Sequence, residues 1–358
     1  MEDFSKRLLE ILNDGLLSAG LVMGHELRLF DALAAVSSEN EPATCTTVAE
    51  KADMRERYVR EWLCLMVCGK IIEVNEDGEK FWIRADRIAD LCGDKPNVLL
   101  VSQQCVLMCA KAYPTVIDLF RKDGPLGMDN KMFDEFDKTM ASISEAAHKE
   151  NIISKFVPAT EMQNKLEEGG IHILDVGCGR GMHIAELASH YPKCFFTGID
   201  LSLEAVVGAN KKRDEANAGL DNVSYMQMNG QMMRDDWTEK FDWVMMFSAC
   251  HDQMRPDHCL KEIYRVLKPD GLFSMFETDG TSNVYKDKEM NTSTFMYGLS
   301  LSHCLPIGMN SEDAMGLGAM WGREKAKQLL GDAGFKKIEI RPDPFSELHS
   351  NILYLCRK

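Results

Sequence analysis

The feature that most constrains this chain is a buried strand that runs directly into a glycine-rich turn. Residues 173–181 read Ile-Leu-Asp-Val-Gly-Cys-Gly-Arg-Gly, and a helix is expected to follow over residues 184–188. Glycine allows a sharp turn and a close approach of the backbone to a ligand, and the first N–H groups of the helix point into the crevice. We therefore expect a ligand-binding crevice where this strand ends.

Beyond residue 169, short apolar strands alternate with helices. The strands are expected at residues 171–176, 195–199, 223–228, 241–247, 271–277, 336–341 and 352–356. Alternation of this kind is typical of a parallel sheet with helices on both faces. The fold class of this part of the chain is therefore α/β.

The first hundred residues follow a different pattern. The expected order is two helices within residues 4–36 joined near Gly20, a short helix capped at Thr46 or Thr47 with Glu50, a helix over 55–69 that stops at Gly69, and a β-hairpin from 71–74 and 81–83. Helix, short helix, helix and hairpin make a winged helix. We expect a winged-helix domain over residues 1–95, a helical connector over 96–168 and a second domain over 169–358.

A winged helix can read DNA, or it can serve as a dimerisation and lid element. The candidate recognition helix carries three basic residues that two acidic residues largely offset, Arg55, Arg57 and Arg60 against Glu56 and Glu61. The whole chain has a formal net charge of −15, whereas tight binding to phosphate backbones requires a basic surface. Nucleic acid is therefore not an expected partner, and the domain offers a surface for a homodimer. A winged-helix transcription regulator is kept as an alternative.

The cysteines do not indicate a disulfide framework or a metal site. The chain has 12 of them, mostly within apolar runs, and we interpret them as reduced core residues. Cys64 and Cys68, like Cys105 and Cys109, stand one helical turn apart, but no Cys-X-X-Cys pair or matching His partner accompanies them, so no metal is expected. The sequence also has no apolar stretch long enough to cross a membrane and no signal-peptide pattern, so we expect a cytoplasmic protein.

The spacing of the glycines separates two classes of ligand. A dinucleotide site requires Gly-X-Gly-X-X-Gly to seat a pyrophosphate, whereas Gly181 comes one residue early. Asp175 stands where an acid can meet an amino group of the ligand, and Asp200, at the end of the next strand, can accept hydrogen bonds from both hydroxyls of a ribose. These features favour S-adenosylmethionine over NAD, and leave a nicotinamide-dependent oxidoreductase as a weaker alternative.

At this point the sequence resembles the class I S-adenosylmethionine-dependent methyltransferases, and in particular the branch with an N-terminal winged helix. The run from Phe241 to Val244 and the run from Glu262 to Gly271 are similar to that family's fourth strand, helix and turn into the fifth strand. The resemblance covers nearly the whole chain. It implies a Rossmann-like domain of seven strands preceded by a mostly helical winged-helix domain.

The resemblance also implies which residues hold the cofactor. The methionine part would contact Asp175, Gly177, Gly179 and Gly181, the ribose Asp200 beside Leu201, and the adenine Asn229 with Gly230. Many relatives have Asp in place of Asn229, but a carboxamide oxygen can still accept a hydrogen bond from the adenine amino group. Phe247 ends the fourth strand, where enzymes of this family face the sulfonium.

The implied reaction is methyl transfer to a small-molecule acceptor. The sulfonium methyl is already electrophilic, so the enzyme has to hold the nucleophile in line and, where the nucleophile carries a proton, supply a base. His251 is the first candidate for that base, with Asp252 or another acid to orient it. His303 lies in an insertion that often contributes to the acceptor pocket in this family.

Several questions stay open at the level of the sequence. His251 can equally hold a loop or contact the cofactor, and the residues do not identify the accepting atom as oxygen, nitrogen, sulfur or carbon. Because a fold does not fix its chemistry, a catalytically inactive relative that acts as an S-adenosylmethionine sensor or scaffold is a further alternative.

Overall fold

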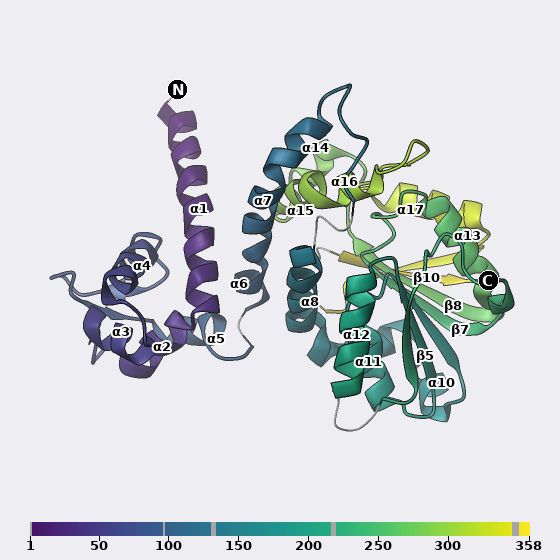
Figure 1. Cartoon of the computed structure of the whole chain (residues 1–358), viewed down its shortest axis with the longest axis horizontal. Coiled ribbons are helices and arrows are strands. Elements are labelled where there is room, and N and C mark those ends of the chain that lie inside the picture. The colour runs from purple at the N-terminus through teal and green to yellow at the C-terminus, as the bar shows by residue number, and fades with distance from the viewer. Residues whose placement is uncertain (1, 96, 130–133, 216–219, 346–350) are drawn as a thin grey trace. The chain divides into compact units, whose positions relative to one another are not determined.

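The computed structural model describes residues 2–95, 97–129, 134–215, 220–345 and 351–358. The chain divides into two compact units, Met1–Ala110 and Lys111–Lys358. Each unit has its own buried core and is described by itself (Figure 1).

The first unit is a winged helix preceded by a long helix. Its helices are α1 (Glu2–Glu26), α2 (Leu29–Val36), α3 (Cys45–Ala52), α4 (Glu56–Cys68), η1 (Ala85–Arg87), α5 (Ile88–Leu91) and α6 (Val98–Ser102), and its strands are β1 (Ala43–Thr44), β2 (Glu73–Val74) and β3 (Lys80–Trp82). The three strands form an antiparallel sheet in the order β1-β3-β2. The predicted winged helix, with its hairpin and the helix that stops at Gly69, is confirmed.

The N-terminal helices break at a different place from the one predicted. Helix α1 continues through Gly20, where a Cβ atom would lie 2.6 Å from the side chains of Leu65 and Met66. This glycine therefore allows α4 to pack closely and does not end a helix. The break falls at Arg28, which adopts a left-handed conformation with a φ of 56°. Within the described ranges, no helix is both long and apolar enough to cross a membrane.

The cap of α3 and the surface of α4 also differ from the predictions. Thr44 caps α3, because its side chain accepts a hydrogen bond from the backbone N–H of Thr47. The pairing of Thr44 with β3 keeps the chain extended up to that residue. On α4, Cys64 and Cys68 are exposed, so these two residues are not part of the core.

The second unit contains a seven-stranded sheet and the helices that cover it. The strands are β4 (His172–Val176), β5 (Phe195–Asp200), β6 (Val223–Gln227), β7 (Phe241–Phe247), β8 (Leu267–Thr278), β9 (Lys337–Pro342) and β10 (Asn351–Arg357). Helices before and between the first strands are α8 (Asp134–His148), η3 (Lys149–Asn151), η4 (Ile152–Phe156), α9 (Val157–Thr160), α10 (Gln163–Glu168), α11 (Met182–His190) and α12 (Leu203–Glu215). Later helices are η5 (Asp235–Trp237), α13 (Pro256–Val266), α14 (Val284–Asp287), α15 (Ser293–Leu299), η6 (Ser300–Cys304), α16 (Leu305–Gly308) and α17 (Arg323–Ala333). Helix α7 (Gln104–Leu119) includes the boundary between the units.

The order of the strands places a crevice at the middle of the sheet. The order is β6-β5-β4-β7-β8-β10-β9, with β4 to β8 parallel and β10 antiparallel to both of its neighbours. All seven predicted strands are present, and the α/β fold class is confirmed. The chain proceeds from β4 toward one edge of the sheet and then crosses to β7 on the other side. Loops after β4 and β7 therefore diverge, which opens a crevice at the carboxyl ends of the strands.

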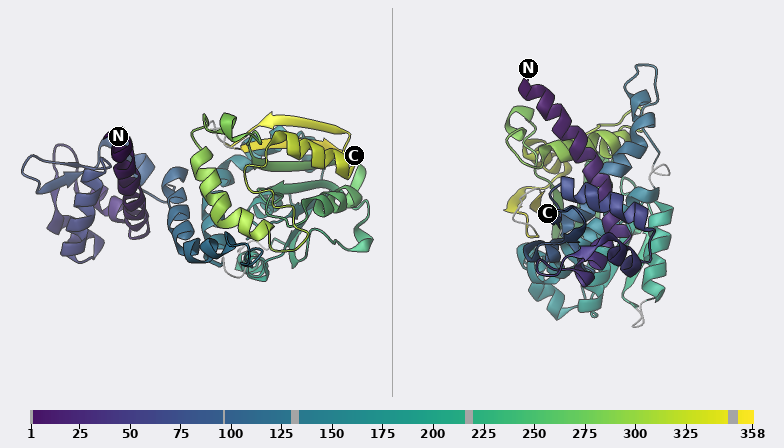
Figure 2. Two further views of the ribbon diagram at one scale, coloured as in Figure 1. Left: turned by 90° about the horizontal axis from the view of Figure 1, so that it is seen from above. Right: turned by 90° about the vertical axis from the view of Figure 1, so that its left-hand side faces the viewer.

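Helices pack on both faces of this sheet, as Figures 1 and 2 show. Alternate residues of each strand point to opposite faces, so Leu174 joins a core with α13 and α17, whereas Ile173 joins a core with η4, α9 and α11. The two cores bury both faces of the central strands. This rigid sheet fixes the positions of the loops that follow β4, β5, β6 and β7.

Candidate functional site

A cavity of about 1090 Å³ lies at the carboxyl ends of β4 to β7. One part of its wall comes from the loops after β4, β5 and β6, and includes Gly179, Asp200 and Asn229. We call this part the donor wall. The other part comes from the loop after β7 and from η6 and α16, and includes Asp252 and His303. We call it the acceptor wall.

The glycine turn after β4 forms the base of the donor wall. Gly177, Gly179 and Gly181 have φ values of 74°, 53° and 75°, in the left-handed region that favours glycine. A Cβ atom on Gly177 would lie 2.6 Å from the side chain of Ala249, and one on Gly181 would lie 2.3 Å from the ring of Tyr225. No atom lies within 4 Å of a Cβ built on Gly179. The turn therefore exposes the backbone of Gly179 to the cavity, while Gly177 and Gly181 on either side of it are closely packed.

Asp175 lies beneath this turn, in the strand itself. It is 1% exposed, and its Oδ2 atom has no hydrogen-bond partner among the described residues. Burial, with a smaller effect of the nearby Asp200, raises the pKa of Asp175 to about 8. A ligand ammonium in hydrogen-bond contact would supply the missing donor and favour the ionised carboxylate. The structure therefore fits the predicted chemistry of Asp175, although this residue does not line the cavity.

Asp200 ties the glycine turn to the end of β5. Its Oδ2 accepts a hydrogen bond of 2.8 Å from the N–H of Gly179, and its Oδ1 accepts one of 2.8 Å from the N–H of Ser202. Burial raises the pKa of Asp200, while these two bonds act in the opposite direction. A carboxylate oxygen can accept more than one hydrogen bond, so both oxygens retain capacity for ribose hydroxyls. Asp200 lines the cavity, as does Leu201 beside it.

The loop after β6 completes the donor wall with Asn229 and Gly230. The Oδ1 of Asn229 already accepts a hydrogen bond of 2.9 Å from the N–H of Gln231. The side chain of Gln227 donates to the carbonyl of Leu201 and so joins the loops after β5 and β6. A Cβ atom on Gly230 would lie 3.0 Å from Val176, so this loop packs tightly on the first strand.

Phe247 lines the cavity and rests on a pair of histidines that the sequence did not indicate. The ring of His183 stacks on Phe247 with a centroid separation of 3.8 Å, and its Nε2 lies 3.0 Å from Nδ1 of His148. Burial lowers the pKa of His148 to about 4 and that of His183 well below its usual value. Both imidazoles are therefore neutral at pH 7. In the hydrogen bond between the two rings, one of the facing nitrogens donates its N–H and the other accepts it.

His251 is held in place by an acid that the sequence reading did not name. Its Nδ1 lies 2.5 Å from Oε2 of Glu277, which is fully buried in β8 and also accepts a hydrogen bond of 2.9 Å from the N–H of Cys250. Burial alone would lower the pKa of His251, but Glu277 and Asp252 outweigh it and raise that pKa well above 6.5. His251 is 3% exposed and does not line the cavity. The signal for Glu277 was an acid at the end of the mostly apolar run 271–277.

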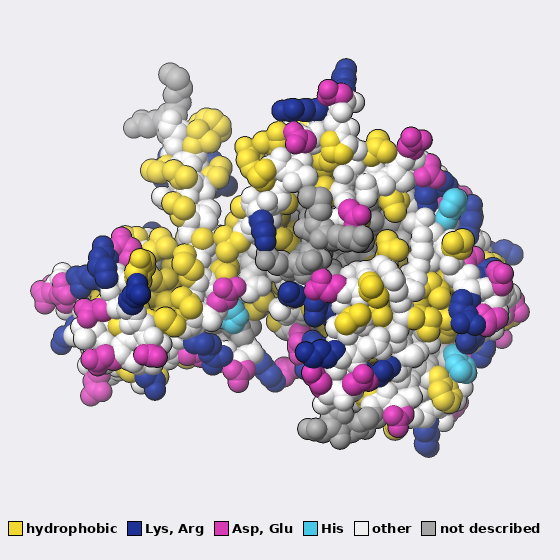
Figure 3. Space-filling view, viewed as in Figure 1, with side chains coloured by type: hydrophobic (Ala, Val, Ile, Leu, Met, Phe, Trp, Pro, Cys, Tyr) yellow, Lys and Arg dark blue, Asp and Glu magenta, His cyan; other side chains and the backbone are white. Residues whose placement is uncertain are grey.

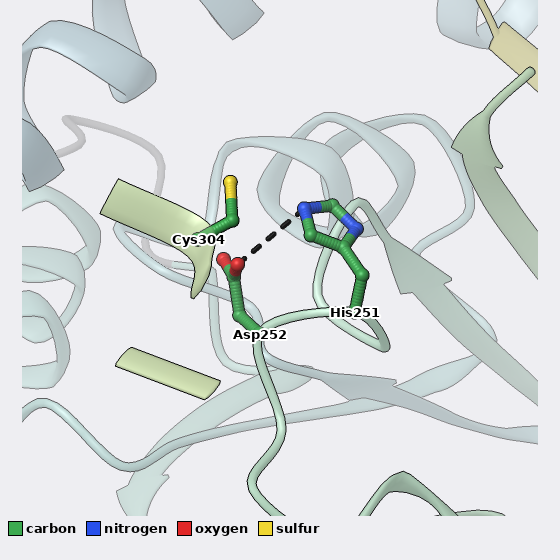
Figure 4. Close-up of side chains that lie close together, drawn as sticks. All are labelled: His251, Asp252 and Cys304. Carbon is green, nitrogen blue, oxygen red and sulfur yellow. Dashed lines mark ion pairs between the residues drawn. The ribbon is translucent and has the colours of Figure 1, made fainter. Parts of the chain in front are cut away.

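Asp252 and Cys304 lie on the other side of the His251 ring (Figure 4). Nε2 of His251 is 3.4 Å from Oδ1 of Asp252. His251, Asp252 and Cys304 each offer one atom of a type that can bind a metal ion, and these three atoms lie within 4.8 Å of one another. Oδ1 of Asp252 is buried without a hydrogen-bond partner among the described residues. Burial lowers the pKa of the neighbouring His303 to about 4, so its imidazole is neutral at pH 7.

The predicted site residues thus fall into two groups by position. Those on the cavity wall are Gly177, Gly179, Asp200, Leu201, Asn229, Gly230, Phe247, Asp252 and His303. Those behind the wall are Asp175, Gly181 and His251. Their roles in binding or catalysis remain predictions.

Two family profiles match this chain, one in each unit. Residues 167–334 match the family described as "Methyltransferase domain", and residues 15–92 match the "Rv2258c-like winged HTH domain". The first match covers β4 to α17, which includes both walls of the cavity. The second covers the winged helix.

Curated relatives are similar to about half of this chain. An S-adenosyl-L-methionine-dependent Diels-Alderase of Talaromyces variabilis is 26% identical over 189 residues, which are 52% of this chain and 59% of the relative. A sterol 24-C-methyltransferase of Debaryomyces hansenii is 28% identical over 172 residues, which are 48% of this chain and 41% of the relative. The chain therefore spans about half the length of the curated relatives it matches.

Solved structures share the fold of both units together. Human N-acetylserotonin methyltransferase, solved in complex with S-adenosylmethionine, superposes with a TM-score of 0.64 at 18% identity. The match covers 99% of this chain and 97% of the human chain. At this identity the likeness concerns the fold, and it includes the winged-helix part as well as the sheet.

Proposed function

Because the chain belongs to the class I S-adenosylmethionine-dependent methyltransferases with an N-terminal winged helix, we propose that it transfers the methyl group of S-adenosylmethionine to a small-molecule acceptor. The observation that carries this proposal is the donor wall. There the bare backbone of Gly179 and the carboxylate of Asp200 meet in a single hydrogen bond at the edge of a large cavity. A turn with a purely structural role would not need to expose the backbone of Gly179 to the cavity.

Three groups of residues would hold the cofactor. Asp175 supplies a carboxylate oxygen for the ammonium of the methionine part, next to the glycine turn. Asp200 accepts hydrogen bonds from the ribose, and Asn229 with Gly230 borders the adenine. When bound, S-adenosylmethionine supplies an electrophilic methyl group on a positively charged sulfur. The residues of the chain then have to position the acceptor and remove its proton.

We assign the proton acceptor to His251, with Glu277 as its positioning residue. The 2.5 Å contact between Nδ1 and Glu277 fixes the ring so that Nε2 faces Asp252 on the cavity wall. A base that is oriented by a buried carboxylate is a recurring arrangement in enzymes. The same carboxylate raises the pKa of His251 well above 6.5, so the imidazole has to release its proton before it can act as the base. His303, neutral and on the wall, is assigned to contact with the acceptor.

A transfer assay with isotopically labelled S-adenosylmethionine tests the proposal. The purified protein is incubated with a metabolite extract, and labelled products are separated and counted. We expect at least one labelled small molecule, and less of it when Asp200→Ala replaces the wild-type protein at a limiting concentration of the methyl donor. Binding of S-adenosylhomocysteine without any transfer would instead identify a sensor or scaffold.

We also propose that the first unit forms a homodimer through α1. Six large apolar side chains of this helix are about half or more exposed, namely Phe4, Leu8, Leu9, Ile11, Leu12 and Leu16. Figure 3 shows hydrophobic side chains along the same helix. A contiguous apolar face of this kind marks an interaction surface, and a second copy offers a matching one.

The oligomeric state tests this second proposal. Light scattering during size-exclusion chromatography should give twice the mass of one chain for the wild type and one chain mass for Leu12→Glu. Arg7→Glu changes a polar residue of the same helix and serves as the matched control. A monomeric wild type at micromolar concentration would contradict the proposal.

A further inference from the structure

The charged side chains that line the cavity are all acidic among the described residues. The described lining residues include four carboxylates, Asp129, Asp200, Glu204 and Asp252, and they include no Lys or Arg. A concave surface with this composition concentrates cations and repels anions. Two of the four acids, Asp200 and Glu204, belong to the donor wall. Asp252 belongs to the acceptor wall and acts on whatever binds there.

One carboxylate oxygen of Asp252 lacks a hydrogen-bond partner among the described residues. His251 is engaged by Glu277 at 2.5 Å, so the charge of the imidazole is balanced within that pair. The contact from His251 to Oδ1 of Asp252 is longer, at 3.4 Å, and Oδ1 has no hydrogen-bond partner among the described residues. A buried carboxylate oxygen without a donor is costly unless a ligand supplies one. The donor it requires is a cationic or strongly polar N–H or O–H group.

We propose that the acceptor is a primary or secondary amine whose nitrogen binds to Asp252 on the cavity wall, with Nε2 of His251 directly behind that carboxylate. This inference rests on the proposed methyl transfer and names its substrate class. Figure 4 shows the ion pair that joins the Asp252 carboxylate to the ring of His251. Asp252 accepts one N–H hydrogen bond. When the amine enters as an ammonium, its additional proton passes to His251 after the imidazole has released its own proton to solvent. Met254 and Ile307 on the same wall provide an apolar surface for the nonpolar part of the amine.

The transfer step balances without any further reactant. The lone pair on nitrogen forms the new N–C bond while the S–C bond breaks, and the electron pair of that bond remains on sulfur. The positive charge moves from sulfur to nitrogen, and the proton taken by His251 leaves to solvent after the product dissociates. Asp252 stabilises the charge as it develops on nitrogen, where the stabilisation lowers the barrier.

An anionic nucleophile fits this wall less well than an amine. A phenol has to become a phenolate to react at a useful rate, and a neighbouring carboxylate raises the pKa of that phenol. A carboxylate acceptor would meet Asp252 and Asp129 without any described Lys or Arg on the wall to offset the repulsion. An amine reacts as a neutral nucleophile and becomes a cation, so the same acids favour it.

Fractionation by charge tests the proposal. A metabolite extract is separated by ion exchange at pH 7 into cationic, neutral and anionic pools, and each pool is incubated with labelled S-adenosylmethionine. We expect labelled product from the cationic pool, and we expect it to remain cationic. Product from only the neutral or anionic pool would overturn the amine assignment. No product from any pool, in protein that binds S-adenosylhomocysteine, would overturn the proposed methyl transfer itself.

Variants of Asp252 test the residue assignment on the active pool. Asp252→Asn should raise KM for the amine at least tenfold while the Kd for S-adenosylhomocysteine changes less than twofold. Asp252→Glu keeps the charge and should recover part of the loss, which separates binding from folding. Glu312→Gln removes an exposed acid outside the cavity and serves as the control. An unchanged KM in Asp252→Asn would contradict the role of this residue.

Discussion

The two walls of the cavity are built in different ways. The donor wall consists largely of backbone, and its central residues come from one continuous strand, turn and strand between Asp175 and Asp200. The acceptor wall and its support consist of side chains from three distant segments, represented by His251, Glu277 and His303. A backbone wall recognises a ligand that all members of a fold share, whereas a wall of side chains can change from one protein to the next. The comparison locates specificity on the acceptor wall.

The largest effect is expected from removal of the base on the acceptor wall. His251→Ala should lower kcat by about 100-fold or more, because a positioned base typically contributes on the order of 100- to 10,000-fold. Binding of S-adenosylhomocysteine, measured by calorimetry, should stay within twofold of wild type. His258→Ala, which changes an exposed histidine of α13, is the matched control. A fully active His251→Ala protein would remove this residue from catalysis.

A smaller effect is expected on the pH dependence of stability. In this respect His148 and His183, beneath the donor wall, differ from His251, behind the acceptor wall. The fold lowers the pKa of His148 from about 6.5 to about 4, so folding favours its neutral form. Its contribution to stability is therefore complete above about pH 6.5 and is lost as the pH falls toward 4. A shift of this size corresponds to about 3 kcal/mol of unfolding free energy. The raised pKa of His251 has the opposite sign, so folding favours its charged form.

Denaturant unfolding at pH 7 and at pH 4 measures this difference. His148→Gln keeps a hydrogen-bonding group beside His183 but cannot titrate. We expect the variant to lose less stability than wild type over that interval, with His190→Gln as the control on an exposed histidine of α11. Equal losses in the variant and the wild type would contradict a neutral, buried His148.

The smallest of the expected effects concerns the ribose contact on the donor wall. Asp200→Ala removes two acceptor oxygens and also the bonds to Gly179 and Ser202. We expect the affinity for S-adenosylhomocysteine to fall at least tenfold, which is about 1.4 kcal/mol. Asp221→Ala removes an acid from the turn before β6, outside the cavity, and should leave the affinity unchanged. An unchanged affinity in Asp200→Ala would refute the ribose assignment.

The difference between the walls also explains how much could be predicted from the sequence. The glycine turn and Asp200 were predicted because their geometry depends on residues close together in the chain, and the seven strands followed from local apolar runs. Glu277 was missed because its partner, His251, lies 26 positions away and meets it only through the pairing of β7 with β8. The pair of His148 and His183 was missed for the same reason.

Errors in the first unit have a related cause. A glycine in a helical pattern is ambiguous, because it can end a helix or admit a neighbour, and Gly20 admits the side chains of α4. The break at Arg28 carries no such signal, since a left-handed arginine is uncommon. The exposure of Cys64 and Cys68 was not predicted either, because apolar runs alone do not tell which side of a helix is covered.

Calorimetric titration of the wild-type protein with S-adenosylhomocysteine is the most direct test of cofactor binding at the donor wall. We expect saturable binding of one molecule per chain, and no detectable binding of NAD under the same conditions. Folded protein that releases no heat with S-adenosylhomocysteine or with S-adenosylmethionine would contradict cofactor binding at the donor wall, and with it the proposed methyl transfer.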